Sequence, residues 1–334
     1  MTADIETVAR QSSVTTAADA LGRGELVAFA TETVYGLGAD ARDGTAVAGI
    51  FAAKGRPHFN PLIVHVLDDD AAAALVDLGD VGAVLARAFW PGPLTLVARA
   101  HHQNGIASLV TAGLDTLAVR VPRHPVARAL LEVANMPVAA PSANRSGKVS
   151  PTRASHVQTE FGAAQVHILD GGPCEAGIES TIVDVSDGMP RLLRHGSITT
   201  EMISEVLGDV GLPLAALPGE MDRLHPTAPG QLASHYAPDA RIRMNAEIPR
   251  PGEGFLGFGS QMPKHAVGCG AAVAPSTINL SVSGDLQEAA ANLFDALRTL
   301  DAASVETIAV MPIPDVGLGR AINDRLSRAA APRD

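Results

Sequence analysis

The sequence predicts an α/β protein with two domains, and three observations lead to that prediction. The chain has 334 residues, which is long for one hydrophobic core. Hydrophobic residues make up 46% of it and charged residues 18%, proportions typical of a globular protein. Apolar runs of strand length alternate with segments of helical periodicity along most of the chain. That alternation favours sheets covered by helices.

A proline-rich segment separates the predicted domains. Leu212 to Pro238 contains five prolines, and we interpret it as an extended linker. The predicted units are therefore a first domain of residues 1–211, a linker of residues 212–238 and a second domain of residues 239–334. Tyr236, near the end of the linker, is either an anchor on a domain surface or a flap over a binding pocket.

Composition and charge exclude several classes of protein. The net charge of −11 argues against a broad nucleic-acid surface, although it leaves room for a small basic pocket. Cys174 and Cys269 are too few for a disulfide framework or a cysteine-rich zinc site, and such low cysteine use fits the reducing cytoplasm. Met1 to Arg10 lacks the apolar core of a signal peptide. No apolar run is long enough to span a bilayer, so we expect no membrane partner.

The first predicted elements lead to a candidate ligand loop. Thr15 to Gly22 has the periodicity of a short helix, and Leu26 to Ala30 is a continuous apolar run typical of a strand buried on both faces. Small hydroxyl side chains and two glycines follow in Thr31 to Gly38. This segment is either a ligand-facing loop or an ordinary turn in which Gly36 and Gly38 supply unusual backbone angles.

A basic loop follows the next helix. Thr45 to Ala53 has helical spacing, and Leu62 to Val66 has the composition of a short buried strand. Lys54 and Arg56 lie between them, on a connection that two prolines stiffen. Cationic side chains on a stiff loop suit a polyanionic ligand, whereas the alternative is a solvated basic turn.

A charge interrupts one of the strands predicted in the middle of the first domain. Residues 71–89 are predicted to be mostly helical with a break near Gly79, and Leu94 to Ala98 to be a strand. Leu117 to Val121 is another apolar run, and Arg120 lies within it. Because an isolated buried charge is costly, Arg120 must be paired or face a ligand.

A loop rich in hydroxyl and amide groups follows the next strand. Pro125 to Asn135 is predicted as a helix with proline in its first turn, and Pro137 to Ala140 as a strand. The strand leads into Pro141 to Thr152, whose side chains offer several donors to an anion without much formal charge. Ser150 or Thr152 is a candidate cap for the following helix. The domain is then predicted to close with a strand, a hairpin and a helix, at residues 166–169, 180–194 and 199–207.

The second domain repeats the alternation of strands and helices on a smaller scale. Strands are predicted at Gly254 to Phe258 and Thr307 to Met311, and helices at Leu286 to Leu300 and Arg320 to Ala330. This order predicts a small parallel, Rossmann-like sheet. The histidines show no metal-site spacing, and the sequence has no nucleophile elbow.

Six short motifs emerge when the loops are taken together. They are Thr31 to Leu37, Lys54 to Leu62, Pro91 to Thr95, Gly113 to Arg120, Pro141 to Gly147 and Glu179 to Asp184. In this order they resemble the motifs of the YrdC-like threonylcarbamoyl-adenylate synthases, in the long form with a second α/β domain. The likeness is strong over residues 12–207 and looser beyond. His235 to Pro238 also matches the family's linker motif, but Ala228 to Ser234 lacks the basic residue that usually precedes it.

The resemblance implies a fold and a reaction. The first domain would be a twisted, open α/β sheet with a positively lined concave face. The enzyme, a nucleotidyltransferase, would form threonylcarbamoyl-AMP and pyrophosphate from L-threonine, bicarbonate and ATP. A separate transferase complex would then move the threonylcarbamoyl group onto adenosine in certain tRNAs, and direct tRNA binding by this chain would be weak. Mg²⁺ would accompany ATP, held chiefly by phosphate oxygens.

The resemblance also implies roles for particular residues. Lys54 and Arg56 would be catalytic, because they would hold the triphosphate of ATP. The residues implied at the threonine site, where Arg120 would clamp the carboxylate, are Thr33, His65, Arg120, Ser142 and Ser180. The residues implied at the nucleotide site are Lys54, Arg56, Asn60, Thr116, Ala140, Ser142, Asn144, Ser150, Arg194 and Tyr236.

Two other functions compete with this interpretation. A carbamoyltransferase of the hydrogenase-maturation type contains a similar domain, but it also carries cysteine-rich zinc modules that two cysteines cannot build. A non-catalytic RNA-binding protein would use the concave basic face, and the net charge of −11 counts against it.

Overall fold

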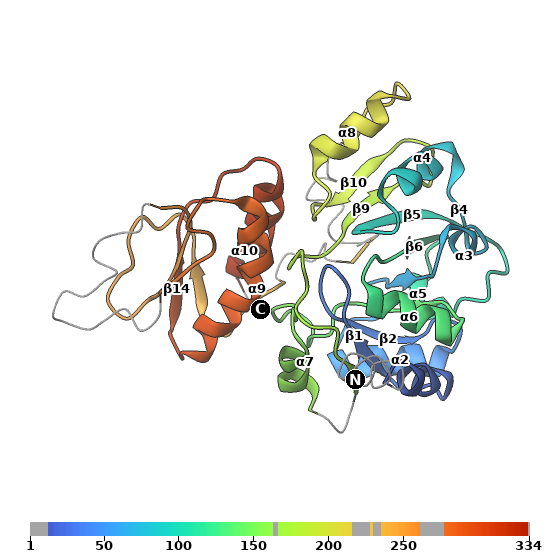
Figure 1. Cartoon of the computed structure of the whole chain (residues 1–334), viewed down its shortest axis with the longest axis horizontal. Helices are drawn as coiled ribbons and strands as arrows, with labels where there is room; N and C mark the ends of the chain where they lie inside the picture. Colours follow the sequence, from blue (N-terminus) through green and yellow to red (C-terminus); the bar gives the residue numbers. More distant parts are fainter. Residues whose placement is uncertain (1–12, 163–165, 216–227, 230–234, 261–276, 333–334) are drawn as a thin grey trace, which may run out of the picture.

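Two sheets, each with its own hydrophobic core, organise the protein (Figure 1). The computed structural model describes residues 13–162, 166–215, 228–229, 235–260 and 277–332. The predicted α/β class is confirmed. The expectations for Met1 to Arg10, for Cys269, for residues 230–234 and for most of the linker before Ala228 lie outside the described residues.

The larger sheet is mixed and has ten strands, in the order β10-β9-β5-β6-β3-β7-β2-β1-β8, with β4 paired to β5. The strands are β1 (Val27–Phe29), β2 (Gly36–Asp40), β3 (Ile63–His65), β4 (Val76–Asp77), β5 (Leu94–Ala100), β6 (Thr116–Arg120), β7 (Val138–Ala139), β8 (His167–Leu169), β9 (Thr181–Asp184) and β10 (Arg191–Arg194). The predicted hairpin is confirmed, because β9 and β10 pair antiparallel.

Helices surround this sheet and bury their apolar side chains against it. They are a helix over residues 13–22, α2 (Gly44–Lys54), α3 (Asp69–Ala73), α4 (Gly79–Phe89), α5 (Ser108–Thr111), α6 (Pro125–Ala134), α7 (Ala154–Phe161) and α8 (Thr200–Gly208). Local chemistry fixes the ends of α2. The Asp43 carboxylate caps its first turn, and Gly55 ends it in the left-handed region at φ 61°. Lys54 is therefore the last residue of a helix.

Two predictions for the first domain need correction. Residues 71–89 are not one broken helix, because β4 lies between α3 and α4 and pairs antiparallel with β5. Gly36 and Gly38 do not supply left-handed backbone angles; they belong to strand β2. A Cβ on Gly38 would lie 2.8 Å from Val138 Cγ1, so this glycine allows close packing between strands.

The smaller sheet is parallel throughout, as the sequence predicts. Its strands run in the order β11 (Arg241–Arg243), β14 (Thr307–Val310), β12 (Gly254–Gly257) and β13 (Thr277–Asn279). Figure 1 shows α9 (Leu286–Ala302) and α10 (Leu318–Ala330) between this sheet and the larger unit. Both helices bury one face in the core of the smaller unit, and the arginines on their other side contact the larger one.

Within the described ranges, no helix combines the length and the apolar composition that crossing a membrane requires.

Candidate functional site

A cavity lies where loops from several strands of the large sheet meet the linker. Nine of its lining residues belong to the predicted site: Thr33, Arg56, His65, Arg120, Ala140, Ser142, Ser180, Arg194 and Tyr236. The other lining residues are Thr31, Val34, Gly36, Ile63, Pro141, Glu179, Pro229 and His235. Loops that are far apart in the sequence therefore contribute to one site.

Strand pairing explains this convergence. β3 and β6 are parallel neighbours, and their last residues, His65 and Arg120, are paired in register. Both side chains thus lie at the same end of the sheet, where functional residues of α/β folds commonly gather. Ser180 directly precedes β9 and Arg194 ends the antiparallel strand β10, so the hairpin brings these two residues together.

Three buried cations beside this cavity have only neutral hydrogen-bond partners in the part of the chain that the structure describes. The Lys54 ammonium group donates to the carbonyl oxygens of Ser142, at 2.5 Å, and Asn144. The Arg56 guanidinium donates to the carbonyls of Asn60 and Pro61, at 3.2 and 2.8 Å. No carboxylate among the described residues forms an ion pair with either cation.

Arg194 is the third of these cations. Its guanidinium donates to the carbonyl oxygens of Ser180, at 3.1 Å, and Pro229, at 3.2 Å, and to the Ser180 hydroxyl at 3.1 Å. Burial lowers the pKa values of Lys54, Arg56 and Arg194, because a charge is costly to keep away from water. An anionic ligand beside them would offset that cost. The arrangement therefore favours a polyanion.

Arg120 is paired, unlike these three cations. Its guanidinium lies 2.6 Å from a Glu32 oxygen and also donates to the Thr33 hydroxyl at 3.0 Å and the Gly92 carbonyl at 3.3 Å. Burial is the largest single influence and alone would raise the pKa of Glu32, but the Arg120 charge and the hydrogen bonds to the carboxylate together outweigh it, so the pKa is lowered. The sequence predicted that Arg120 is either paired or faces a ligand, and this contact shows that it is paired. A guanidinium has five N–H groups, so two remain for a ligand carboxylate.

Unsatisfied polar atoms mark the same region. Among the described residues, both polar atoms of the Asn60 amide, Nδ1 of His65, Oδ1 of Asn144 and Nδ1 of His235 are buried without a hydrogen-bond partner. Leaving such an atom unpaired costs about 1–3 kcal/mol. Burial lowers the pKa of His65 from 6.5 to about 3, so this imidazole is neutral near pH 7. A neutral imidazole accepts or donates hydrogen bonds without adding charge.

Five predicted site residues do not line the cavity. Lys54 binds the backbone of the loop that carries both Ser142 and Asn144, and the Ser150 hydroxyl donates to Glu179 at 2.5 Å. Asn60 is buried at the end of the basic loop, where its carbonyl accepts from Arg56. Thr116 is half-buried at the first position of β6. Their predicted roles as ligand contacts stay predictions.

Glu32, Glu179 and His235 line or support the cavity, but the sequence prediction gave them no role. All three lie in motifs that carry the family resemblance. Glu179 lines the cavity, accepts from Ser150, and binds Nε of Arg325 at 2.8 Å with its other oxygen. A carboxylate among predicted phosphate-binding residues was passed over because its cationic partner is 146 positions away.

The linker forms the outer wall of the cavity. Tyr236 is 1% exposed, and its ring stacks on Phe294 with centroids 5.7 Å apart, while the Arg325 guanidinium lies 5.0 Å from the ring centre. Its φ of 62° is unusual for a residue with a side chain and is typical of functional sites. The free volume is about 50 Å³, whereas ligand pockets commonly hold several hundred. The cavity is therefore smaller than a typical ligand pocket.

The described residues do not form a metal site of their own. They contain no cluster of three or more histidine, cysteine, aspartate or glutamate side chains suited to a metal ion. The two carboxylates at the cavity, Glu32 and Glu179, are both paired with arginines. This donor set does not fit a protein-held Mg²⁺, which prefers carboxylate oxygens and water.

Comparisons with known proteins match nearly the whole chain. A family model described as "Telomere recombination" (Sua5, YciO and YrdC) matches residues 19–196. A second, described as "Threonylcarbamoyl-AMP synthase, C-terminal domain", matches residues 198–331. The chain is 40% identical over 325 residues to a threonylcarbamoyl-AMP synthase of Pyrococcus abyssi, covering 95% of this chain and 94% of that relative.

A bacterial relative and a solved structure agree with these matches. The chain is 40% identical over 327 residues to a threonylcarbamoyl-AMP synthase of Bacillus subtilis, covering 95% of this chain and 92% of that one. A crystal structure described as P. abyssi Sua5 complexed with L-threonine superposes with a TM-score of 0.83 at 36% identity, covering 96% of this chain and 94% of that chain.

Proposed function

The chain belongs to the threonylcarbamoyl-AMP synthase family, and from this membership we propose how its site carries out the synthesis. The protein is a threonylcarbamoyl-AMP synthase that uses L-threonine and ATP and serves tRNA modification. Its finer class is that of a nucleotidyltransferase, because an adenylyl group moves from ATP to a carboxylated amino acid.

The proposed reaction has two steps. The amine of threonine first takes up bicarbonate, as carbon dioxide, to give a carbamate. A carbamate oxygen then attacks the α-phosphorus of ATP, the bond between the α-phosphorus and the bridging oxygen breaks, and pyrophosphate leaves. No protein nucleophile is needed, so catalysis consists of positioning and of stabilising negative charge.

The three buried cations with neutral partners are the observation that carries this proposal. Lys54, Arg56 and Arg194 provide a local positive charge on a chain whose net charge is −11. A triphosphate supplies the counter-charge that their hydrogen-bond partners do not provide. The same groups stabilise the charge that develops on pyrophosphate as it leaves. Arg56 and Arg194 line the cavity and contact the phosphates, while Lys54 acts through the loop that carries Ser142.

The threonine end of the cavity lies around Arg120. Its two free N–H groups bind the threonine carboxylate, and Glu32 fixes the direction of the guanidinium. Thr33, His65, Ser142 and Ser180 are the polar side chains available for the amine and the hydroxyl of the substrate. Threonine and the phosphates thus lie side by side, as an attack on the α-phosphorus requires.

Several partners belong to the same proposal. Mg²⁺ arrives with ATP on the phosphate oxygens, and no step above is assigned to it because the residues that the structure describes offer it no ligand set. The threonylcarbamoyl group passes to a separate transferase complex that modifies tRNA. The enzyme works in the cytoplasm, the location that its low cysteine content favours.

Pyrophosphate release with single omissions tests the proposal. The complete mixture contains the full-length protein, L-threonine, bicarbonate, ATP and Mg²⁺. We expect release to fall to background when either threonine or bicarbonate is left out, because the carbamate is the attacking group. Equal release without one of them would overturn the proposed chemistry.

A further inference from the structure

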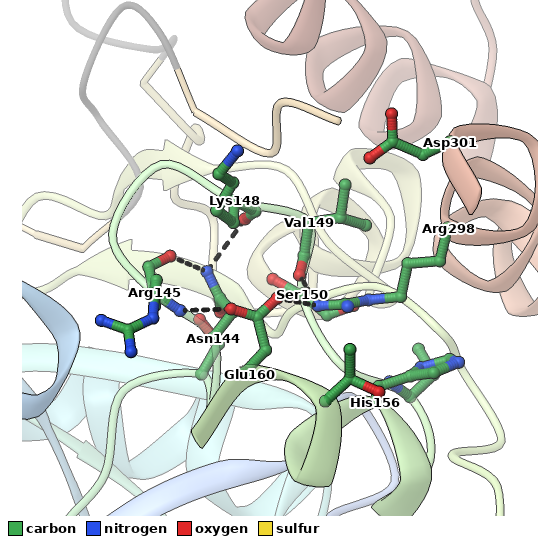
Figure 2. A network of polar contacts seen from close by, with 12 residues as sticks. Asn144, Arg145, Lys148, Val149, Ser150, His156, Glu160, Arg298 and Asp301 are labelled. Atoms are coloured by element: carbon green, nitrogen blue, oxygen red, sulfur yellow. Dashed lines mark hydrogen bonds and ion pairs between the residues drawn. The ribbon is translucent and has the colours of Figure 1, made fainter. Parts of the chain in front are cut away.

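Arg298 of the second domain contacts the loop that carries Ser142 and Ser150. Its guanidinium donates to the Val149 carbonyl, lies 3.5 Å from the Ser150 carbonyl and pairs with Glu160 at 2.9 Å. The Arg298 side chain is 16% exposed and that of Glu160 12%. Figure 2 shows Arg298 reaching from its helix to this loop. A side chain of helix α9 therefore binds the backbone of a first-domain segment.

Glu160 connects Arg298 to the beginning of the same segment. Its second carboxylate oxygen accepts from the backbone N–H of Arg145 at 3.1 Å. The Asn144 amide donates to the carbonyls of Arg145, at 2.7 Å, and Lys148, at 2.9 Å (Figure 2). These contacts close residues 144–150 into a compact loop. Its two ends are joined through one ion pair, Arg298 with Glu160.

This loop lies directly behind the cavity. The Lys54 ammonium group binds the carbonyls of Ser142 and Asn144, and Ser142 itself lines the cavity. The Ser150 hydroxyl binds Glu179, another lining residue. A shift of the loop would therefore move Ser142, Lys54 and Glu179 together. Displacements of about 1 Å are enough to cost a large factor in rate.

We propose that Arg298 is a positioning residue for the synthesis: through Val149 and Glu160 it holds the loop of residues 141–150, which places Ser142 at the cavity and whose backbone binds Lys54. The proposal deepens the proposed function, on which it rests. It also assigns work to the second domain, whose helix α9 stabilises the nucleotide side of the site without touching the substrate.

Another set of interdomain contacts on the same helix provides a matched control. Asp295 forms an ion pair with Arg153 at 3.2 Å and lies 3.1 Å from Nε2 of His156, whose pKa is lowered by burial to about 4, and both contacts join the domains. No contact of the Asp295 side chain reaches the backbone of residues 144–150 in the described structure. Asp295→Asn therefore weakens docking of α9 but leaves the loop contacts of Arg298 in place.

The experiment compares Arg298→Met, Arg298→Lys and Asp295→Asn in the full-length protein. We expect Arg298→Met to raise KM for ATP about tenfold and KM for threonine only about two- to threefold, because the lost charge-assisted hydrogen bonds support Lys54 and Ser150 on the nucleotide side but only Ser142 at the threonine end. Arg298→Lys should recover part of the loss, since an ammonium group can still donate to Val149 and Glu160 but lacks the planar fork. Asp295→Asn should leave both KM values unchanged. Equal effects of Arg298→Met on the two substrates, or effects that Asp295→Asn reproduces, would overturn the proposal.

Hydrogen exchange separates this proposal from the reaction itself. We expect amide exchange in residues 144–150 to speed up about tenfold in Arg298→Met and not in Asp295→Asn, whether or not the protein is turning over. Unchanged exchange would contradict a positioning role for Arg298 even if synthesis is normal. If the wild-type protein released no pyrophosphate, the proposed function would be rejected. Faster exchange in Arg298→Met would in that case still support the contact between Arg298 and the loop.

Discussion

The hydrogen-bond partners of each buried cation indicate its function. Arg120 has a carboxylate partner, Glu32, which keeps it oriented and partly neutralised. Lys54, Arg56 and Arg194 have carbonyl and hydroxyl partners, so much of their charge remains available to a ligand. A buried charge without a counter-charge is costly. We therefore place the anionic substrate beside these three residues.

Arg56 is the residue whose loss should damage the reaction most clearly. We expect Arg56→Ala to lower kcat/KM for ATP about 10²–10³-fold, as removal of a preorganised charge at a phosphate typically does. We also expect the rise in melting temperature on adding ATP to shrink. Arg99→Ala is the control, because the Arg99 side chain is 65% exposed and its loss should change neither quantity. Near-normal turnover of Arg56→Ala would remove this residue from the site.

The buried imidazole of His65 should make stability depend on pH. The pKa of His65 is lowered from 6.5 to about 3 in the folded state. Between these two pH values the unfolded chain therefore binds a proton at His65 that the folded chain does not bind. The free energy of unfolding should therefore fall as the pH drops from 6.5 toward 3, by up to ~1.4 kcal/mol per pH unit from this residue.

Chemical denaturation between pH 6 and 5 measures this effect. His65→Asn should flatten the slope of unfolding free energy against pH by close to one proton. His102→Asn, at an exposed position, should leave the slope as it is. If His65→Asn and the wild type have the same slope, the imidazole is not buried as neutral in the folded protein.

The sequence predicted which residues belong to the site better than it predicted their contacts. Arg56, Arg120 and Arg194 were all expected there, because their residue types suit anions and their motifs match a family. The pairing of Arg120 with Glu32 was left open, and that of Glu179 with Arg325 was not foreseen. Such partners are 88 and 146 positions apart, and only the folded chain brings them together.

At the scale of single elements, strand β2 shows how side-chain volume limits the packing of neighbouring strands. Gly38 lies beside Val138 of β7 and Phe29 of β1 in the packed sheet. We expect Gly38→Val to lower the free energy of unfolding by about 1–3 kcal/mol, because the added methyl groups would overlap both neighbours. Gly22→Ala is the control, since a Cβ there meets no atom of the described residues within 4 Å. Equal stability of Gly38→Val and the wild type would refute the close packing.

Elements with a strong local signal were predicted well. Proline at the start of α6, the turn within the β9–β10 hairpin, and the apolar stripe of α9 are all features that a short window of sequence contains. Strand β4 was missed because its two residues, Val76 and Asp77, are too few to show alternation. It exists through its pairing with β5, a contact between segments that no local pattern encodes.

At the scale of the whole molecule, the site depends on both domains. Pro229, His235 and Tyr236 of the linker line the cavity. Arg325 of α10, fully buried, supports Glu179 and the Tyr236 ring from behind. Removing the second domain would take away the Arg325 partner of Glu179 and the Phe294 ring that stacks on Tyr236.

Two truncations separate the linker from the second domain. Proteins ending at residue 211 or at residue 238 should both lose most pyrophosphate release: the shorter one lacks Tyr236, and the longer one keeps it but lacks Arg298 and Arg325. Far-UV circular dichroism and threonine binding would confirm that the large sheet still folds. If the protein ending at residue 238 released pyrophosphate at the normal rate, the second domain would not be needed for the reaction.

A double-label turnover measurement decides whether threonine, bicarbonate and ATP react together in this cavity. The full-length protein is given ¹⁴C-bicarbonate and ATP labelled with ³²P at the α-phosphate, together with threonine, and the nucleotide products are separated. We predict a single new nucleotide that carries both labels in equal amounts and forms in step with pyrophosphate. Labelled AMP or ADP that contains no ¹⁴C, formed at the same rate with and without bicarbonate, would contradict the account.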